Sequence, residues 1–490
     1  MLLRALRLPV LKNWKAILKD CLKLSLRVGG LDIIINILYR MFFFEKVLIY
    51  IYYIIMTTPE NPFAPPSQKF IDEQKAKYFD FSDIILTETE PITQQPNSFP
   101  PPSKELISSL KNKFSKLSNI SLNKNKTIFR KKDSDKNNNN NAFQENSSSN
   151  TQTSYTIAEL QTAYKYNNVQ NQSFSVKPII AIVMFNSYAD LQSNFDLFCQ
   201  ANNLPAYTLN IIPINSPPED SNAGSEMCID TQCSYGMCPN AEILVVQAES
   251  SSLQDLAVAI SVANSYNPDI INMSWDATST EFSNEQQENS ESLFTNDCLY
   301  CASSGDSNNV GWPSTDPGVL AVGGTSLYTN SDGSILSQSA WSSTGCGPSA
   351  YLDIPNYQKN YTNLTSTFRN TCDLSALADP NTGVQCYWEG EVYIFGGTSV
   401  AAPLCSGLFA IANGIRKNQN LGIINSSASS NLGVQNILYS NYSSNGSTLF
   451  YDVVEGSSGS YAAGPGWDNP TGLGTPYGEA MVNFLANFQD

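Results

Sequence analysis

A serine at the start of an apolar helix is the first residue whose surroundings suggest chemistry. Ser399 follows a Gly-Gly-Thr turn at 396–398 and begins an apolar stretch that ends at Lys417. The glycines let a ligand approach the backbone closely, and the helix dipole behind Ser399 favours a nucleophilic hydroxyl there. Ser399 can also be a simple helix cap. Pro403 is unusual behind a plain cap, because proline is tolerated mainly in the first turn of a helix.

Three further carboxylates are candidates for proton transfer. Glu226 and Asp230 are four residues apart and would share one helix face, where proximity raises the pKa of one of them and creates a base for acidic conditions. The alternative is a pair of solvated acids. Asp306 ends the segment Ser-Ser-Gly-Asp at 303–306, after apolar residues. It is either a turn residue or a protonated acid that donates a hydrogen bond to an oxyanion.

Two more aspartates flank a glycine-rich segment near the C-terminus. Asp452 precedes it, and Asp468 follows the residues Ala-Gly-Pro-Gly-Trp at 463–467. Two carboxylates together with the carbonyl oxygens of such a loop form an oxygen-only site suited to Ca²⁺. In isolation, the same residues could form a tight turn.

The composition restricts which chemistry is possible. The chain of 490 residues has no histidine, which excludes a Ser-His-Asp unit, a Cys-His unit and a His-ligated zinc site. Residues 137–490 carry only 6 of the 28 basic side chains but 31 of the 44 acidic ones. So acidic a region is not expected to bind nucleic acid. If the protein is a hydrolase, carboxylates must transfer the protons.

The elements that would position these residues are short buried strands alternating with helices. Residues 179–185, 243–247, 269–275 and 319–322 are apolar and rich in β-branched side chains, as in buried strands. Residues 191–201, 253–263 and 399–417 have the periodicity of helices. The alternation predicts an α/β fold with a mostly parallel sheet and helices on both faces. Ligands of such sheets bind at the carboxyl ends of strands and at helix N-termini.

Composition divides the chain into three parts. Residues 1–56 are basic and apolar, and 33–56 predict a signal peptide or a signal anchor, although an artefactual extension is an alternative. Residues 57–153 are rich in Pro, Ser, Asn and Lys and predict a disordered linker. Residues 154–490 predict the folded domain. Its clustered cysteines and its sequons, Asn171, Asn360, Asn363 and Asn445, favour disulfides and glycosylation outside the cytosol over a Cys-only zinc site.

Several motifs follow one another in a fixed order. Tyr-Thr-Ile-Ala-Glu-Leu at 155–160 and Pro-x-Tyr-Gln at 355–358 accompany five others: Ile-Asn-Met-Ser at 271–274, Ser-Gly-Asp at 304–306, Ala-Val-Gly-Gly-Thr at 321–325, Gly-Gly-Thr-Ser-x-Ala-x-Pro at 396–403, and Gly-Trp-Asp-x-x-Thr-Gly-Leu-Gly-Thr-Pro at 466–476. In this order, and with no histidine, they resemble the sedolisin family, the serine-carboxyl peptidases. The resemblance covers about residues 154–487. It implies a subtilisin-like fold in which glutamate replaces the histidine of subtilisin.

The resemblance also implies a role for each candidate residue. Ser399 would be the nucleophile, Glu226 the general base, Asp230 the acid that orients Glu226, and Asp306 the oxyanion donor. Met227 departs from the family, which usually has tryptophan there, and this puts the wall of the substrate pocket in doubt. The family is also made with a large folded pro-domain, whereas residues 57–150 are too short and too polar to form one.

One Ca²⁺ ion is the only cofactor that the resemblance implies. The side chains of Asp452 and Asp468 and the backbone oxygens of Val453, Gly464 and Gly466 would bind it in the C-terminal loop region.

We therefore expect an acid-active endopeptidase or tripeptidyl-peptidase that hydrolyses peptides or unfolded proteins through an acyl-enzyme on Ser399. Carboxylate catalysis indicates a secreted or lysosome-like acidic location. We expect a monomer whose only membrane contact would be the segment 33–56. The alternative is a catalytically inactive binding or adhesion protein that keeps the same fold.

Overall fold

The computed structural model describes residues 99–118, 122, 128–132, 154–277, 292–294, 297–359, 361 and 366–489. The segment 33–56 lies outside the described residues, so the signal peptide or anchor stays a prediction. Among the described residues, the single helix apolar and long enough to cross a membrane is Thr398–Asn418, and it is buried inside the fold.

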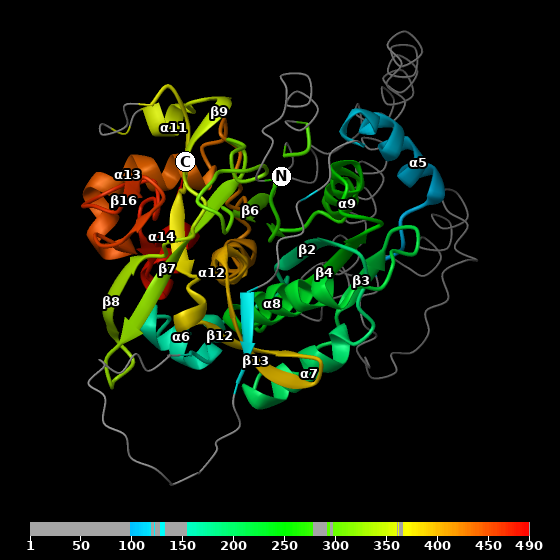
Figure 1. Cartoon of the computed structure of the whole chain (residues 1–490), viewed down its shortest axis with the longest axis horizontal. Coiled ribbons are helices and arrows are strands. Elements are labelled where there is room, and N and C mark those ends of the chain that lie inside the picture. Colours follow the sequence, from blue (N-terminus) through cyan, green and yellow to red (C-terminus); the bar gives the residue numbers. More distant parts are fainter. Residues whose placement is uncertain are drawn as a thin grey trace, which may run out of the picture. The chain divides into compact units, whose positions relative to one another are not determined.

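A predominantly parallel sheet forms the centre of the fold (Figure 1). In the part of the chain that the structure describes it has eight strands, of which only β8 is antiparallel to its neighbour. In spatial order the strands are β11 (Leu374–Leu377), β7 (Leu320–Thr329), β6 (Leu299–Ser303), β5 (Ile270–Met273), β2 (Ile179–Phe185), β4 (Glu242–Ala248) and β3 (Asn210–Pro213), with β8 (Ile335–Ala340) paired to β7. The predicted parallel sheet is thus confirmed.

The strands form where continuous apolar runs predict them. Strand β2 has the predicted bounds, and its central residues are fully buried. In four of the strands, β2, β4, β5 and β6, side chains at successive positions are buried, so both faces of the sheet are covered.

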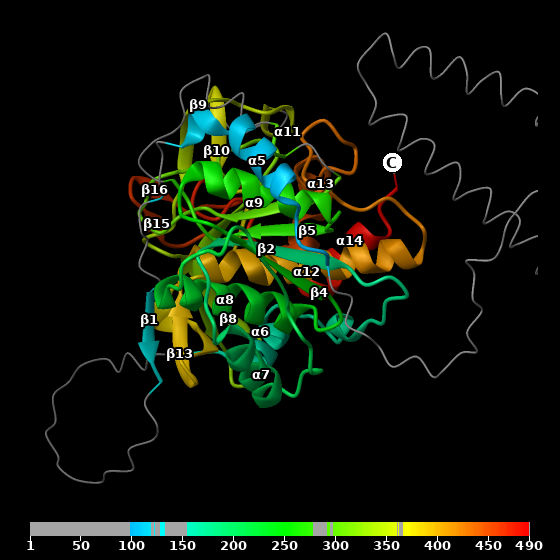
Figure 2. The same ribbon diagram turned by 90° about the vertical axis from the view of Figure 1, so that its right-hand side faces the viewer.

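Helices cover both faces of the sheet (Figure 2). Helix α9 (Leu253–Ser265) packs on β2 and β4, with α5 (Lys104–Lys113) outside it. On the opposite face, α8 (Ser221–Met237) and α12 (Thr398–Asn418) pack against each other and against the sheet. Helices α6 (Ile157–Ala163) and α7 (Leu191–Ala201) contact α8, and α14 (Gly478–Ala486) contacts α12. Helices α7, α9 and α12 confirm the predicted helical segments.

Smaller elements complete the fold outside the central sheet. The hairpin of β12 (Val384–Trp388) and β13 (Glu391–Gly396) leads directly into α12. The others are β9 (Gly347–Asp353) with β10 (Phe368–Thr371), β14 (Phe450–Tyr451) with β17 (Thr475–Pro476), β15 (Ser457–Ser458) with β16 (Tyr461–Ala462), the helices α11 (Asn356–Lys359) and α13 (Val434–Leu449), and the 3-10 turns Ser115–Leu117, Val169–Asn171 and Pro380–Thr382.

Two segments differ from the linker expected over 57–153. Helix α5 is capped by Ser103, and its Lys111 Nζ contacts Glu249 at 2.5 Å and Asp255 at 3.2 Å. Strand β1 (Ile128–Lys131) pairs antiparallel with β13. The average composition of 57–153 does not reveal these two short segments. Each needs only a few apolar residues to pack on the folded domain that begins at residue 154.

The predicted disulfides are absent among the described residues. All ten described cysteines are free thiols, and all ten are buried. Two of these thiols contact each other without a disulfide bond: Cys233 Sγ and Cys386 Sγ are 3.9 Å apart. The clustering that suggested cross-links has another physical origin here, since a buried cysteine packs as a small apolar residue.

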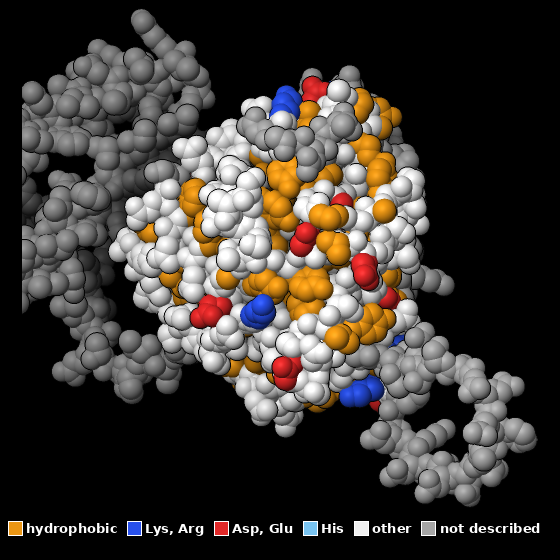
Figure 3. Space-filling view, turned by 90° about the vertical axis from the view of Figure 1, so that its left-hand side faces the viewer, with side chains coloured by type: hydrophobic (Ala, Val, Ile, Leu, Met, Phe, Trp, Pro, Cys, Tyr) orange, Lys and Arg blue, Asp and Glu red, His pale blue; other side chains and the backbone are white. Residues whose placement is uncertain are grey.

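One face of the molecule shows how sparse the charges are (Figure 3). Red and blue side chains are few and scattered among apolar and uncharged polar ones. This view agrees with the sequence, in which only 15% of all residues are charged.

Candidate active site

The predicted nucleophile and the predicted base are in contact. Ser399 Oγ donates a hydrogen bond of 3.0 Å to Glu226 Oε1. Ser399 lies in the first turn of α12, and Glu226 lies in the second turn of α8. The exposed fraction is only 8% for Ser399 and 7% for Glu226. The packing of α12 against α8 therefore joins two residues that are 173 positions apart in the sequence.

The turn before Ser399 requires glycine at position 397. Gly397 has a φ of +109°, which residues with a side chain rarely adopt. A Cβ atom there would lie 2.6 Å from Asp306 Oδ2, so the site has no room for one. Pro403 lies within α12 and has no N–H for the carbonyl of Ser399, four residues earlier. Both residues distinguish this helix start from an ordinary serine cap.

Asp230 lies one helical turn after Glu226 and is fully buried. Residues 223–237 of α8 are all buried, so the two acids are not a solvated surface pair. Asp230 Oδ1 accepts a hydrogen bond of 2.5 Å from Ser274 Oγ. Burial raises the pKa of Asp230 to about 8, and the hydrogen bonds from Ser274 and Asn272 oppose this shift. Asp230 is therefore protonated under acidic conditions.

Asp306 lies beside the start of α12, just beyond the carboxyl end of β6. Its Oδ1 accepts hydrogen bonds of 2.8 Å from both the backbone N–H and the Oγ1 of Thr398. Thr398 Oγ1 in turn accepts from the backbone N–H of Gly305 at 3.0 Å. Burial raises the pKa of Asp306, and the two bonds from Thr398 oppose the shift. Because Oδ1 is used as an acceptor, a proton on Asp306 belongs on Oδ2.

These groups can perform acyl transfer. A hydroxyl in contact with a carboxylate base meets the geometric requirement for an activated serine. A protonated carboxyl next to the nucleophile can donate a hydrogen bond to a developing oxyanion. The site lies at the carboxyl ends of β5 and β6 and at the N-terminus of α12, where parallel sheets usually bind ligands.

Sequence reasoning gave no role to three residues of this site. Thr398 holds Asp306, while Ser274 and Asn272 contact the buried side of Asp230. The motif Ile-Asn-Met-Ser at 271–274 was the available signal, since it places polar residues at the end of an apolar strand. Met227, which replaces a family tryptophan, is fully buried, and its Sδ accepts a hydrogen bond of 3.5 Å from Gln247 Nε2.

The residues of the expected calcium loop also lie together. Asp452 accepts from the N–H of Gly466 at 3.1 and 3.2 Å, and Asp468 Oδ2 accepts from the N–H of Gly464 at 2.9 Å. Burial raises the pKa of Asp468 to about 6, with a smaller contribution from the charge of Asp452. Val453 is fully buried next to Asp452. Two carboxylates around one glycine-rich loop fit a hard cation, although no cluster of three or more Cys, Asp or Glu occurs among the described residues.

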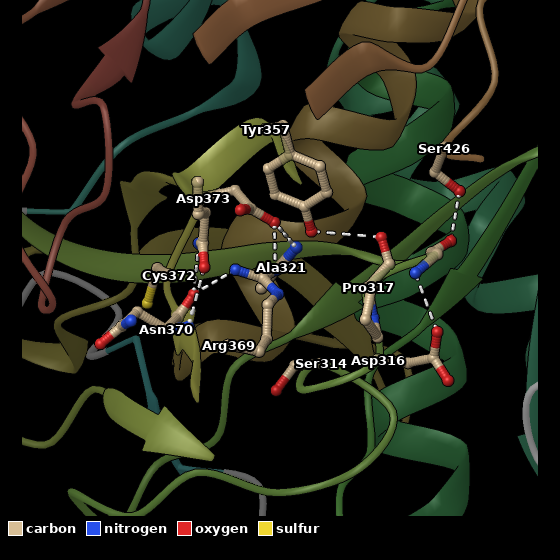
Figure 4. A network of polar contacts seen from close by, with 12 residues as sticks. Ser314, Asp316, Pro317, Ala321, Tyr357, Arg369, Asn370, Cys372, Asp373 and Ser426 are labelled. Atoms are coloured by element: carbon tan, nitrogen blue, oxygen red, sulfur yellow. Dashed lines mark hydrogen bonds and ion pairs between the residues drawn. The ribbon is translucent and has the colours of Figure 1, made fainter. Parts of the chain in front are cut away.

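A buried polar network lies around Arg369 and Asp373 beside the central sheet (Figure 4). Through Tyr439 and Trp467 it also reaches this loop. Arg369 Nη2 contacts Asp373 Oδ2 at 2.6 Å, and both side chains are almost fully buried. Asp373 Oδ2 also accepts from the backbone N–H of Ala321 on β7, at 2.9 Å. Asp373 Oδ1 accepts from Tyr439, whose hydroxyl accepts from Trp467 Nε1 at 3.0 Å. Trp467 immediately precedes Asp468, so the network anchors the loop.

Comparison with known proteins shows which proteins this chain is similar to. A model of the subtilase family matches residues 221–472, just over half of the chain. The chain is 34% identical to sedolisin of Pseudomonas sp. over 185 residues, which are 35% of this chain and 29% of that protein. It is 29% identical to kumamolisin of Bacillus sp. over 307 residues, which are 55% of this chain and 52% of that protein. The chain thus spans about half or less of these curated relatives.

A solved structure extends the likeness to about two thirds of the chain. Pseudomonas sedolisin in complex with two molecules of pseudo-iodotyrostatin superimposes with a TM-score of 0.59 and 26% identity. The match covers 68% of this chain and 98% of that one. The fold is therefore subtilisin-like, as expected. The chain belongs to the subtilase family, and its likeness to sedolisin and kumamolisin supports the sedolisin family of serine-carboxyl peptidases.

Proposed function

We propose that this protein is an acid-active peptidase that hydrolyses peptide bonds through an acyl-enzyme on Ser399. The observation that carries the proposal is the hydrogen bond of 3.0 Å from Ser399 Oγ to Glu226 Oε1 in a chain without histidine. Its substrates would be peptides or unfolded proteins. The relatives named sedolisin and kumamolisin support this class of reaction.

The proposed mechanism begins with attack of Ser399 Oγ on the carbonyl carbon of the substrate. Glu226 Oε1 takes the hydroxyl proton as the new C–O bond forms, and the carbonyl oxygen becomes an oxyanion. Asp306, protonated on Oδ2, donates a hydrogen bond to that oxyanion. Glu226 then returns the proton to the leaving amine, and the C–N bond breaks. Water releases the acyl group by the same steps.

Acid dependence follows because Asp306 and Glu226 must be in different protonation states at the same time. Asp306 donates only when it is protonated, whereas Glu226 must be ionised to accept a proton. Burial raises the pKa of Asp306, which widens the range of pH in which both conditions hold. Activity should therefore be lost as pH rises through the pKa of Asp306. This points to an acidic location, such as a secreted or lysosome-like one.

One Ca²⁺ ion is proposed for the loop of Asp452 and Asp468. The carboxylates of these two residues would hold it, together with backbone oxygens of Val453, Gly464 and Gly466. The ion would neutralise two neighbouring carboxylates and tie β14 to the loop at 464–468. It has no part in the steps of the reaction.

The test is labelling by an active-site-directed peptide aldehyde at pH 4, with hydrolysis of an unfolded protein measured from pH 3 to pH 7. The wild type should be labelled and should hydrolyse, and Ser399→Ala should do neither while it keeps its circular dichroism spectrum. Ser399 is not the N-cap of α12, and its hydroxyl donates to Glu226, so the change removes no helix cap. A folded wild type that is neither labelled nor active would favour the alternative, an inactive binding protein.

A further inference from the structure

A line of buried hydrogen bonds continues from the candidate site into the core. Ser274 Oγ donates to Asp230 Oδ1 at 2.5 Å, and Asn272 Nδ2 donates to Ser274 Oγ at 3.0 Å. Ser406 Oγ donates to Asn272 Oδ1, also at 3.0 Å. The exposed fraction of Ser274 is 4%, and Asn272 and Ser406 are fully buried. The line crosses from α12 through the end of β5 to α8.

We propose that Ser406, Asn272 and Ser274 are positioning residues that hold Asp230 in a single orientation behind Glu226. The proposal rests on the proposed peptidase function and adds a buried relay to it. None of the three side chains would touch the substrate, so each would act only through Asp230.

The direction of the relay follows from what each group can donate. Asn272 has one amide oxygen and one NH₂ group, and the hydroxyl of Ser406 engages the oxygen. The NH₂ group of Asn272 therefore faces Ser274 and donates a hydrogen bond to Ser274 Oγ. The one hydroxyl proton of Ser274 is then left for Asp230 Oδ1. As a result, Oδ1 is held as an acceptor, and a proton on Asp230 must be on Oδ2.

This arrangement assigns the two oxygens of Asp230 different roles. Oδ1 faces the relay, and Oδ2 is left to carry the proton on the helix face that Asp230 shares with Glu226. A protonated Oδ2 can donate to Glu226 and keep its carboxylate turned toward Ser399. Without the relay, the proton could reside on either oxygen, and the carboxyl could rotate.

The titratable groups around Asp230 do not change this assignment in acid. Besides Glu226, they are the thiols of Cys233 on α8 and Cys301 on β6, which interact with the charge of Asp230. Burial raises the pKa of Cys301 to about 12 and that of Cys233 well above its ordinary value. Both thiols are therefore neutral throughout the range in which Asp230 titrates.

A double-mutant cycle tests whether Ser274 acts through Asp230. Asp230 is protonated in acid, so Ser274→Ala should lower kcat about 3- to 10-fold, the range for losing one hydrogen bond to a neutral group, with KM nearly unchanged. In the Asp230→Ala background the same change should lower kcat less than about twofold, because the group that Ser274 holds is gone. Ser234→Ala is the matched control, since Ser234 is a buried serine of α8 whose hydroxyl donates to Pro403 O at 3.4 Å. An equal loss in both backgrounds would overturn the relay.

An infrared titration tests the same relay without turnover. The carbonyl stretch of protonated Asp230 is identified as the band that Asp230→Asn removes. Ser274→Ala should raise the pH at which this band disappears, because Ser274 stabilises the ionised form, and Ser234→Ala should not. An unchanged titration in Ser274→Ala refutes the relay. If the wild type shows no turnover at all, the proposed function fails, and the titration still decides the relay.

Discussion

Replacing Asp306 by asparagine should separate acid dependence from catalysis. Asp306 Oδ1 accepts two hydrogen bonds from Thr398, so the asparagine oxygen should take this position and keep both. The amide NH₂ group then replaces protonated Oδ2 as the oxyanion donor. Unlike a carboxylic acid, an amide donates at any pH. The variant should therefore lose the alkaline limb that belongs to residue 306.

The effect of Asp306→Asn on the rate can be worked out both below and above the pKa of Asp306. Removing an oxyanion donor altogether lowers kcat by about 10²–10³-fold, so a displaced but intact donor should lower the maximum rate about tenfold. Above the pKa of Asp306, the wild-type rate falls about tenfold for each pH unit, in proportion to the protonated fraction. Two units above that pKa, the variant should be about ten times faster than the wild type. The two pH profiles should therefore cross.

The assay is kcat/KM for a quenched fluorescent peptide from pH 3 to pH 8, with circular dichroism at each pH. Asp353→Asn, a change at an exposed aspartate of β9, is the matched control and should leave the profile unchanged. Parallel profiles that never cross, from a folded variant, would refute the assignment of Asp306 to the oxyanion. They would leave it as a turn residue.

Glu226→Gln should lower kcat by about 10²–10⁴-fold because the amide cannot accept the proton, and Asp230→Asn should lower it less, as single-turnover rates would show; wild-type rates in both would contradict these roles. Chelation of Ca²⁺ should lower Tm more at pH 7 than at pH 4. The pKa of Asp468 is raised from 3.8 to about 6, so stability without the ion is lost as pH rises through that value; a Tm indifferent to chelator and to Asp468→Ala would exclude the site. Arg369→Met leaves a buried carboxylate unpaired and should lower the free energy of unfolding by about 3–5 kcal/mol in guanidinium titrations. Lys131→Met removes the exposed ion pair of Lys131 with Glu391 and should lower the free energy of unfolding by less than about 1 kcal/mol. Equal losses in Arg369→Met and Lys131→Met would contradict the difference in burial between the two pairs.

The sequence predicts the local elements well because their signals are local. Strand β2 and helix α7 have the predicted bounds, since a continuous apolar run and a regular helical period each lie within one short window. Segments such as α5 and β1 escape prediction because their stability comes from the surfaces on which they dock. The composition of 57–153 contains no information about those surfaces.

The site divides in the same way. The i and i+4 spacing of Glu226 and Asp230 is visible in the sequence, but their contact with Ser399 was suggested only by resemblance to a family. Asn272 and Ser406 are 134 positions apart, so no local pattern could join them. The prediction of disulfides was wrong for a different reason. The cysteines do cluster in the sequence, but in the fold their side chains pack as apolar groups.

The pairing of β1 with β13 determines how far this protein can be shortened. Phe129 of β1 packs its ring on Trp388, Tyr393 and Phe395, at centroid distances of 4.7, 5.5 and 5.6 Å. A recombinant chain that begins at Ser154 would lack this strand and leave β13 as an open edge with aromatic side chains uncovered. Open edges pair with other chains. Such a truncation should aggregate, whereas cleavage within 133–153 would leave β1 in place as a noncovalently held peptide.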